Sequence, residues 1–394
     1  MKLDYSTKLG YSYPMGVSMR DGAINIVIEF PHSPKRVCGI ILYAANHETM
    51  RIPFCDEYRI GNLYCVRLEG LKISKFMYKF YVDDLVFSDP YARKIVGREK
   101  WGNPQGADAP VYGAFDMEKP EYDWEKDKCP GIPYEDSILY SLHVRGFTKH
   151  PSSKVSGKGT FEGLTEKIDY LKKLGITAIE CMPIYEFQEM IYNPAYTTFQ
   201  VQNLPFMQDK NIWEYRVNYW GFSDKDNFYF APKYSYGGGK DPELSCKNMI
   251  RALHKNGIEC ILQFYFSKDQ TPAFIQEVLR FWVMEYHVDG FHLFGVSLPM
   301  QLIGNDPILK RTKIYCENTM ADKIYADVPA PEFRNLAAYR DDFRFDSRKF
   351  LKGDEDMLGR MTMYMRENNE KEALIHHITD YRGFTLMDLV SYDR

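Results

Sequence analysis

The sequence lacks several features that mark particular classes of protein. Its eight cysteines form no Cys-x-x-Cys pair and several stand in apolar runs, so we expect free thiols in a reducing compartment. No apolar run approaches the length of a membrane span, and the N-terminal stretch MKLDYSTKLGYSYP has no apolar segment typical of a signal peptide. The chain has 50 basic and 54 acidic residues, so it lacks the excess of basic residues that is typical of a nucleic-acid-binding surface. We therefore expect a cytoplasmic protein with no membrane or nucleic-acid partner.

Aromatic residues are abundant, at 15% of the chain, with 30 Tyr and 25 Phe. Flat aromatic rings stack on the apolar faces of sugars, so this composition suits a carbohydrate-binding surface. A tyrosine-rich core and loops would give the same composition, and the two interpretations remain open at this point.

The first 118 residues read as short β-strands separated by Gly, Pro, Asn and Asp turns, with no amphipathic helix of ordinary length between them. This pattern is typical of a β-sandwich, which we predict for residues 1–118. Residues 119–136 are charged and contain proline, so we expect a linker there.

From residue 137 onward, strands and helices alternate. The expected strands are SILYSLHV (137–144), TAIECMPI (177–184), IECILQFYF (258–266), GFHLFGV (290–296), TKIYCE (312–317) and ALIHHIT (373–379). The expected helices cover 161–175, 242–256, the segment after Thr271-Pro272, and 353–370. Apolar strands that alternate with helices form parallel sheets buried on both faces. The fold class is therefore α/β: a TIM-type (β/α)₈ barrel over 137–394, which we expect to be truncated after about seven strands.

Several segments resemble the α-amylase family, glycoside hydrolase family 13, in its glycogen-debranching, isoamylase and pullulanase branch. They are LHVRGFT (142–148), LKKLGITAIECMPIYEF (171–187), NYWGF (218–222), YFAPKYSYGG (229–238), ALHKNGIECIL (252–262), HVDGF (287–291) and GFTLMDLVSY (383–392). The matches are collinear. In addition, SDPYAR (88–93) resembles the end of the family 48 carbohydrate-binding module that precedes such barrels.

The resemblance implies three acidic catalytic positions, and this chain keeps one of them. Glu317 fits the position of the general acid/base. Phe294 stands at the nucleophile position of a Gly-Phe-Arg-Phe-Asp motif, and His292 replaces its arginine. Arg382 stands where the third carboxylate is expected, with Asp380 two residues earlier. A phenyl ring cannot form the covalent glycosyl intermediate of a retaining glycosidase, so we expect a catalytically impaired protein, a pseudoenzyme.

The resemblance also implies residues that contact the sugar. The expected substrate-binding residues are Asn218, Tyr219, Trp220, Tyr236, His292 and Asp380. We expect no cofactor and no metal site, since the adjacent histidines His376 and His377 would point to opposite faces of a strand.

The preferred hypothesis is a protein of α-glucan metabolism that binds glycogen, starch or malto-oligosaccharide with little or no hydrolysis. One alternative is an active debranching hydrolase that has recruited the carboxylates of Asp380, Asp269 and Glu317. Another is a non-catalytic interaction or scaffold protein, and oligomers could form through the open edges of the barrel.

Overall fold

The computed structural model describes residues 5–30, 37–44, 47–104, 109–192, 215–327, 332–381 and 391. Two compact units are present: residues 1–124 with 185–245 form unit 1, and residues 125–184 with 246–394 form unit 2. Residues 185–245 lie within the expected barrel domain 137–394, yet they group with the N-terminal part. The reason is apolar packing, since Phe228 and Ala231 share a buried cluster with Ala92 and Ile95.

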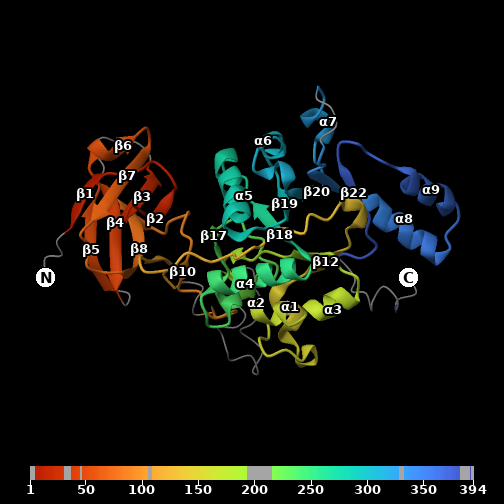
Figure 1. Ribbon diagram of the computed structural model, residues 1–394, viewed down its shortest axis with the longest axis horizontal. Helices are drawn as coiled ribbons and strands as arrows, with labels where there is room; N and C mark the ends of the chain where they lie inside the picture. Colours follow the sequence, from red (N-terminus) through yellow and green to blue (C-terminus); the bar gives the residue numbers. More distant parts are fainter. Residues whose placement is uncertain are drawn as a thin grey trace, which may run out of the picture. The chain divides into compact units, whose positions relative to one another are not determined.

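Unit 1 contains two antiparallel sheets that form a β-sandwich (Figure 1, red and orange). The first has the order β1-β7-β3-β2, with β6 beside β7: β1 (Ser6–Leu9), β2 (Gly16–Arg20), β3 (Ala23–Glu29), β6 (Arg59–Ile60), β7 (Leu63–Glu69). The second has the order β10-β11-β8-β4-β5, with β9 beside β8: β4 (Cys38–Ala44), β5 (His47–Pro53), β8 (Lys75–Val82), β9 (Leu85–Phe87), β10 (Ile95–Val96), β11 (Tyr112–Asp116). Two short pairs complete the unit: β14 (Tyr185–Glu186) with β17 (Phe228–Pro232), and β15 (Met190–Tyr192) with β16 (Tyr215–Val217).

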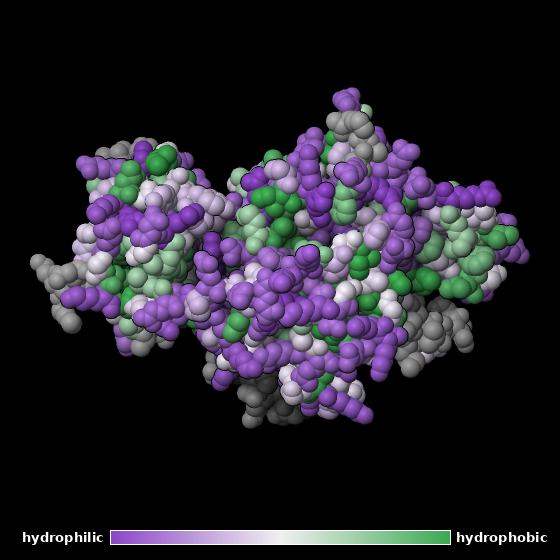
Figure 2. All heavy atoms as spheres, viewed as in Figure 1, coloured by the Kyte–Doolittle hydropathy of each residue, from purple (hydrophilic) through white to green (hydrophobic). Residues whose placement is uncertain are grey.

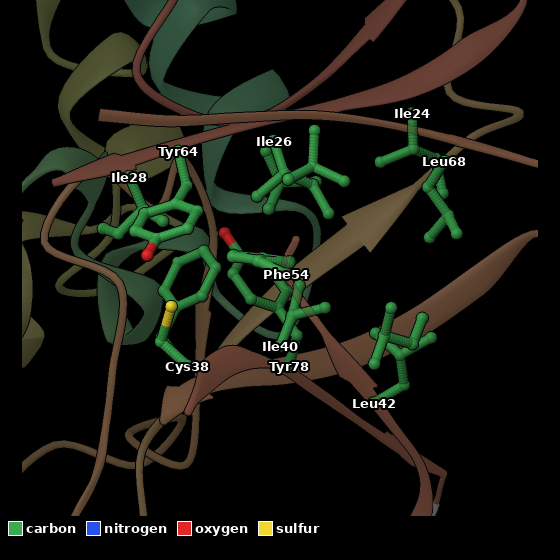
Figure 3. Packing of buried hydrophobic residues seen from close by; sticks show 14 of the residues in the cluster. Ile24, Ile26, Ile28, Cys38, Ile40, Leu42, Phe54, Tyr64, Leu68 and Tyr78 are labelled. Atoms are coloured by element: carbon green, nitrogen blue, oxygen red, sulfur yellow. The ribbon is translucent and has the colours of Figure 1, made fainter. Parts of the chain in front are cut away.

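Alternate residues of the sandwich strands build its core. Ile24, Ile26 and Ile28 of β3 point to the same side and meet Ile40 and Leu42 of β4 in the other sheet (Figure 3). This period-2 pattern explains why the strands were visible in the sequence.

Asp89, in the SDPYAR segment, is enclosed beside this core. Its carboxylate accepts a hydrogen bond from the Tyr78 hydroxyl at 2.8 Å and another from the Tyr91 amide at 2.9 Å. Burial raises the pKa of Asp89 to about 6, although both hydrogen bonds favour the charged form.

Unit 2 is built on a seven-stranded parallel sheet with the order β12-β13-β18-β19-β20-β21-β22 among the described residues. Its strands are β12 (Leu139–Leu142), β13 (Ala178–Cys181), β18 (Glu259–Phe266), β19 (Gly290–Gly295), β20 (Lys313–Cys316), β21 (Leu336–Tyr339) and β22 (Ala373–Ile375). All neighbouring pairs are parallel, and β13 and β20 are buried at every position. The prediction of a truncated (β/α)₈-type barrel behind a β-rich N-terminal region is confirmed.

Helices follow most of these strands (Figure 1). They are α1 (Val144–Lys149), α2 (Phe161–Thr165), α3 (Ile168–Lys173), α4 (Pro242–Lys255), α5 (Pro272–Tyr286), α6 (Met300–Gly304), α7 (Ala321–Ile324), α8 (Asp341–Lys352) and α9 (Met357–Arg366). Short 3₁₀ helices cover Asp56–Tyr58, Tyr134–Asp136, Pro151–Ser153, Tyr234–Gly237 and Leu309–Arg311. The helix expected over 161–175 is divided into α2 and α3, while α4 and α5 begin at the predicted prolines.

Exposed apolar side chains gather on helices α8 and α9. In Figure 2 hydrophilic residues cover most of the visible face, and hydrophobic residues stand among them over the α8–α9 segment. The exposed large apolar side chains of this segment are Phe345, Phe350, Leu351, Leu358, Met363 and Met365. In the part of the chain that the structure describes, no helix combines the length and apolar character needed to cross a membrane.

Candidate functional site

Side chains that share one face of the parallel sheet in unit 2 form successive layers. The first layer is a buried apolar cluster of Ala178, Ile261, Tyr315, Ala337 and Ala373. Side chains alternate between the two faces of a strand, so residues two positions further on share that face. Three of these residues are polar, namely Glu180 on β13, Gln263 on β18 and Tyr339 on β21, while Ile375 on β22 is apolar. The layer toward the carboxyl ends of the strands, where barrel enzymes hold their active sites, is therefore polar.

The Glu180 carboxylate is the centre of this polar layer. One oxygen accepts hydrogen bonds from Nδ1 of His292 at 2.5 Å and from Nε2 of Gln263 at 2.7 Å. The other oxygen accepts a hydrogen bond from the hydroxyl of Tyr339 at 2.5 Å. Glu180 is only 2% exposed, so three strands supply the donors that replace water around a buried charge.

These contacts set the charge of the cluster. Burial alone would raise the pKa of Glu180, but His292 and the hydrogen bonds from Tyr339 and Gln263 outweigh it and lower that pKa. Burial raises the pKa of Tyr339 well above its usual value, and the neighbouring Glu180 charge adds to this effect. At neutral pH, Glu180 is therefore a carboxylate and Tyr339 remains a hydrogen-bond donor to it.

The same layer holds buried polar atoms without a hydrogen-bond partner among the described residues. They are Nε2 of His292 and Oε1 of Gln263, and the hydroxyl of Tyr315 in the adjacent apolar layer is also without a partner among these residues. Buried polar atoms are rarely left unpaired in native proteins, and such atoms often mark positions for water or a ligand. The cluster can therefore accept further polar groups at its inner surface.

Phe294 and His292 lie together at the carboxyl end of β19. Their rings have centroids 4.1 Å apart and are tilted by 34°. On the other side, the His292 ring stacks on Tyr339, with centroids 4.4 Å apart and planes 7° apart. Three aromatic rings thus occupy the region where the resemblance implies an arginine and a carboxylate nucleophile.

The remaining expected site residues of unit 2 follow its last strands. Glu317 follows β20 directly and is exposed. Asp380 follows β22, and its carboxylate forms an ion pair with Nη1 of Arg344 on α8 at 2.7 Å. Arg382 lies outside the described residues.

The four expected sugar contacts of unit 1 differ in exposure. Tyr219 and Trp220 are each 41% exposed, while Tyr236 is only 1% exposed and stacks on Trp101 at 5.7 Å. The side chain of Asn218 holds its own loop, because it donates to the Gln188 carbonyl at 3.2 Å and accepts from the Gly221 amide at 3.1 Å. Tyr219 and Trp220 therefore keep exposed ring surface beside their contacts with Trp101 and Phe222, whereas the side chains of Tyr236 and Asn218 contact other parts of the loop region.

A buried ion cluster in unit 1 was not predicted. Nζ of Lys233 lies 2.8 Å from Oε1 of Glu186 and 2.8 Å from Oε1 of Glu189, and Lys233 is completely buried. Glu189 also lines a cavity of about 240 Å³, together with Arg98 and Gln188. In the sequence, the lysine of YFAPKY stands in an otherwise apolar and aromatic segment, and this position was the sequence signal of a buried charge.

Comparison with known proteins agrees with this architecture. Residues 145–270 match the catalytic domain of alpha amylase. The chain is 26% identical to chloroplastic isoamylase 3 of Oryza sativa subsp. japonica, over 100% of this chain and 60% of that protein. It is 27% identical to chloroplastic isoamylase 1 of Arabidopsis thaliana, over 98% of this chain and 61% of the relative. The crystal structure of a mutant pullulanase from Paenibacillus barengoltzii complexed with maltotetraose aligns with a TM-score of 0.61 at 18% identity, covering 85% of this chain and 58% of that one.

The structure therefore has the fold of an α-amylase-type barrel. Its sequence is similar to those of isoamylases, in agreement with the motifs that resemble the glycogen-debranching branch, and its fold is similar to that of a pullulanase. It spans about 60% of the length of the curated relatives.

Proposed function

We propose that this protein binds α-1,4/α-1,6-glucan, such as glycogen, starch or malto-oligosaccharide, with little or no hydrolysis. The similarity to isoamylases and to a pullulanase complexed with maltotetraose supports the ligand class. The unusual side chains at the strand ends of unit 2 support the loss of catalysis.

The observation that carries this proposal is the aromatic ring of Phe294 at the nucleophile position, in contact with His292. Retaining glycosidases attack the anomeric carbon with a carboxylate and pass through a glycosyl ester. A phenyl ring has no lone pair for that attack, and it offers no negative charge to an oxocarbenium-like transition state.

Two carboxylates of unit 2 already have partners. Glu180 accepts three hydrogen bonds inside the sheet, and Asp380 is paired with Arg344. An active hydrolase would need one of these, or Asp269, to replace the missing nucleophile. Moving Glu180 or Asp380 to a sugar would leave a buried cation or several donors unpaired, at a cost of about 3–5 kcal/mol.

The exposed rings of Tyr219 and Trp220 are the candidates for glucan contact in unit 1. A ring that stacks on a sugar must present a free face, and both residues keep 41% of their surface exposed. By contrast, Tyr236 is enclosed against Trp101, so we assign it to the support of the loop.

Affinity electrophoresis in gels containing glycogen tests the proposal together with an assay for released reducing ends. We expect the wild-type protein to be retarded by glycogen and to release no reducing sugar from glycogen or pullulan. Trp220→Ala should reduce the retardation. The matched control is Tyr170→Ala, which removes an aromatic ring that is 44% exposed on α3 of unit 2, and it should be retarded like the wild type.

Each other outcome has a defined meaning. Release of reducing ends that Glu317→Gln abolishes would favour the hydrolase and contradict the proposal. Absence of both retardation and product would favour the interaction protein. A cytoplasmic or other reducing location is part of the proposal, supported by eight cysteines that are all free, six of them buried.

A further inference from the structure

A cluster of metal-ligating side chains lies at the opposite end of the parallel sheet from Glu180. His254 is in the last turn of α4, Asp289 immediately precedes β19, and Cys129 lies between β11 and the 3₁₀ helix Tyr134–Asp136. One ligand atom from each residue lies within 4.8 Å of the other two. All three residues belong to unit 2 and lie toward the amino ends of its strands, whereas barrel enzymes hold their active sites at the carboxyl ends.

We propose that Cys129, His254 and Asp289 form a Zn²⁺ site. One thiolate, one imidazole and one carboxylate form a ligand set that suits this ion, with water in the fourth position of a tetrahedron. The proposed glucan contacts do not include these residues, so the two proposals can be tested separately.

The surroundings of His254 resemble the outer shell of a metal site. Nδ1 of His254 lies 3.0 Å from Oδ2 of Asp127, and this carboxylate is also 2.9 Å from Nδ1 of His287. Metal-binding histidines commonly donate their second ring nitrogen to a carboxylate, which fixes the orientation of the ring. Asp127 therefore directs Nε2 of His254 toward Asp289.

Asp289 supplies an independent observation. Its Oδ2 accepts from the Cys260 amide at 2.7 Å and lies 2.9 Å from Nε2 of His254, whereas its Oδ1 is buried without a hydrogen-bond partner among the described residues. A buried carboxylate oxygen without a partner is costly, and an ion would satisfy it.

The geometry needs only a small adjustment. Zinc bonds of about 2.0 Å at a tetrahedral angle place a nitrogen and an oxygen ligand about 3.3 Å apart. Nε2 of His254 and Oδ2 of Asp289 are now 2.9 Å apart, so an ion that binds Nε2 and Oδ1 would replace this contact and move the two groups apart by a few tenths of an ångström. Cys129 is exposed and gives the ion access from the surface, while His254 and Asp289 are each only 7% exposed.

Cobalt substitution tests this site, because Co²⁺ bound to a thiolate gives a charge-transfer absorption band. We expect the wild-type protein to bind Co²⁺ with 1:1 stoichiometry and to show this band, and Zn²⁺ to displace it. Cys129→Ser should abolish the band. Cys55→Ser is the matched control, because Cys55 is the other exposed cysteine and belongs to unit 1, and it should leave the band unchanged.

Two further measurements test the site without a change at Cys129. Zn²⁺ should protect Cys129 of the wild-type protein from alkylation by iodoacetamide and leave Cys55 reactive. Asp127→Asn should weaken Zn²⁺ binding by about 10–100-fold, as expected for a group that orients a ligand. The proposal is overturned if the wild type shows no band and no protection, or if the band survives Cys129→Ser.

Discussion

Removing the Tyr339 hydroxyl tests whether the Glu180 cluster is a charged network that stabilises unit 2. The hydroxyl donates to a buried carboxylate at 2.5 Å, and a hydrogen bond to a charged group contributes about 1.5–3 kcal/mol. Unit 2 contains roughly 200 residues, for which 1 kcal/mol changes the unfolding temperature by about 2–4 °C. Tyr339→Phe should therefore lower the unfolding temperature of unit 2 by about 3–12 °C, measured by scanning calorimetry.

The matched control is Tyr325→Phe. The Tyr325 hydroxyl is also buried, but it donates to the neutral side-chain oxygen of Asn335 at 2.6 Å. A neutral hydrogen bond contributes about 1 kcal/mol, so this variant should lose less stability than Tyr339→Phe. Glu180→Gln should cost about 1.5–3 kcal/mol, because it removes the buried charge to which the Tyr339 hydroxyl and the Gln263 amide donate. Equal losses for the two tyrosine variants, or a loss below about 0.5 kcal/mol for Glu180→Gln, would refute the reasoning.

The cluster also predicts the direction of a pH effect. The folded pKa of Glu180 is lowered, so the unfolded chain binds the proton more readily. The contribution to stability is fully present above the unfolded pKa of about 4.3 and is lost as the pH falls through the folded pKa. Glu180→Gln should therefore show a weaker loss of stability in acid than the wild type, and an unchanged acid slope would contradict the assignment.

Two other predictions concern unit 1. Asp89 has a folded pKa of about 6, above its unfolded value, so its contribution favours folding at low pH and is lost as the pH rises from about 4 to 6. At about 1.36 kcal/mol per pKa unit, the free energy of unfolding should fall by about 3 kcal/mol over this pH range. Urea titrations should show that Asp89→Asn lacks this pH dependence. Lys233→Met should cost about 3–5 kcal/mol in the same assay, because it leaves buried Glu186 and Glu189 without a cation. Lys119→Met, at a lysine whose side chain is 32% exposed, should cost no more than about 1 kcal/mol, and equal losses for the two lysines would contradict this account.

Much of the fold could be predicted from local signals. The helix α5 begins at Thr271-Pro272 because the threonine side chain accepts from the Phe274 amide at 3.2 Å and proline fits the first helical position. By contrast, β21 was not identified, because Leu336–Tyr339 has four residues and two of them are alanines with little strand preference. Its presence depends on pairing with β20 and β22, which a single sequence does not display.

The candidate site was predicted only in part. Phe294 and His292 were identified from a motif, and they do lie in contact. Glu180 was missed as a site residue, although a lone acidic residue in the strand TAIEC was a visible signal of a buried charge with partners. Cys129 precedes His254 by 125 residues and Asp289 follows His254 by 35, so no short spacing motif joins the three in the sequence.

The central claim is that this protein binds glucan without forming a glycosyl ester. Intact-mass spectrometry after incubation with an activated 5-fluoro-α-glucosyl fluoride tests it most directly, because this reagent accumulates the covalent intermediate of retaining glycosidases. We predict an unmodified mass, with glycogen still retarding the same sample in a gel. A sugar adduct on any carboxylate, mapped by peptide sequencing, would contradict the account.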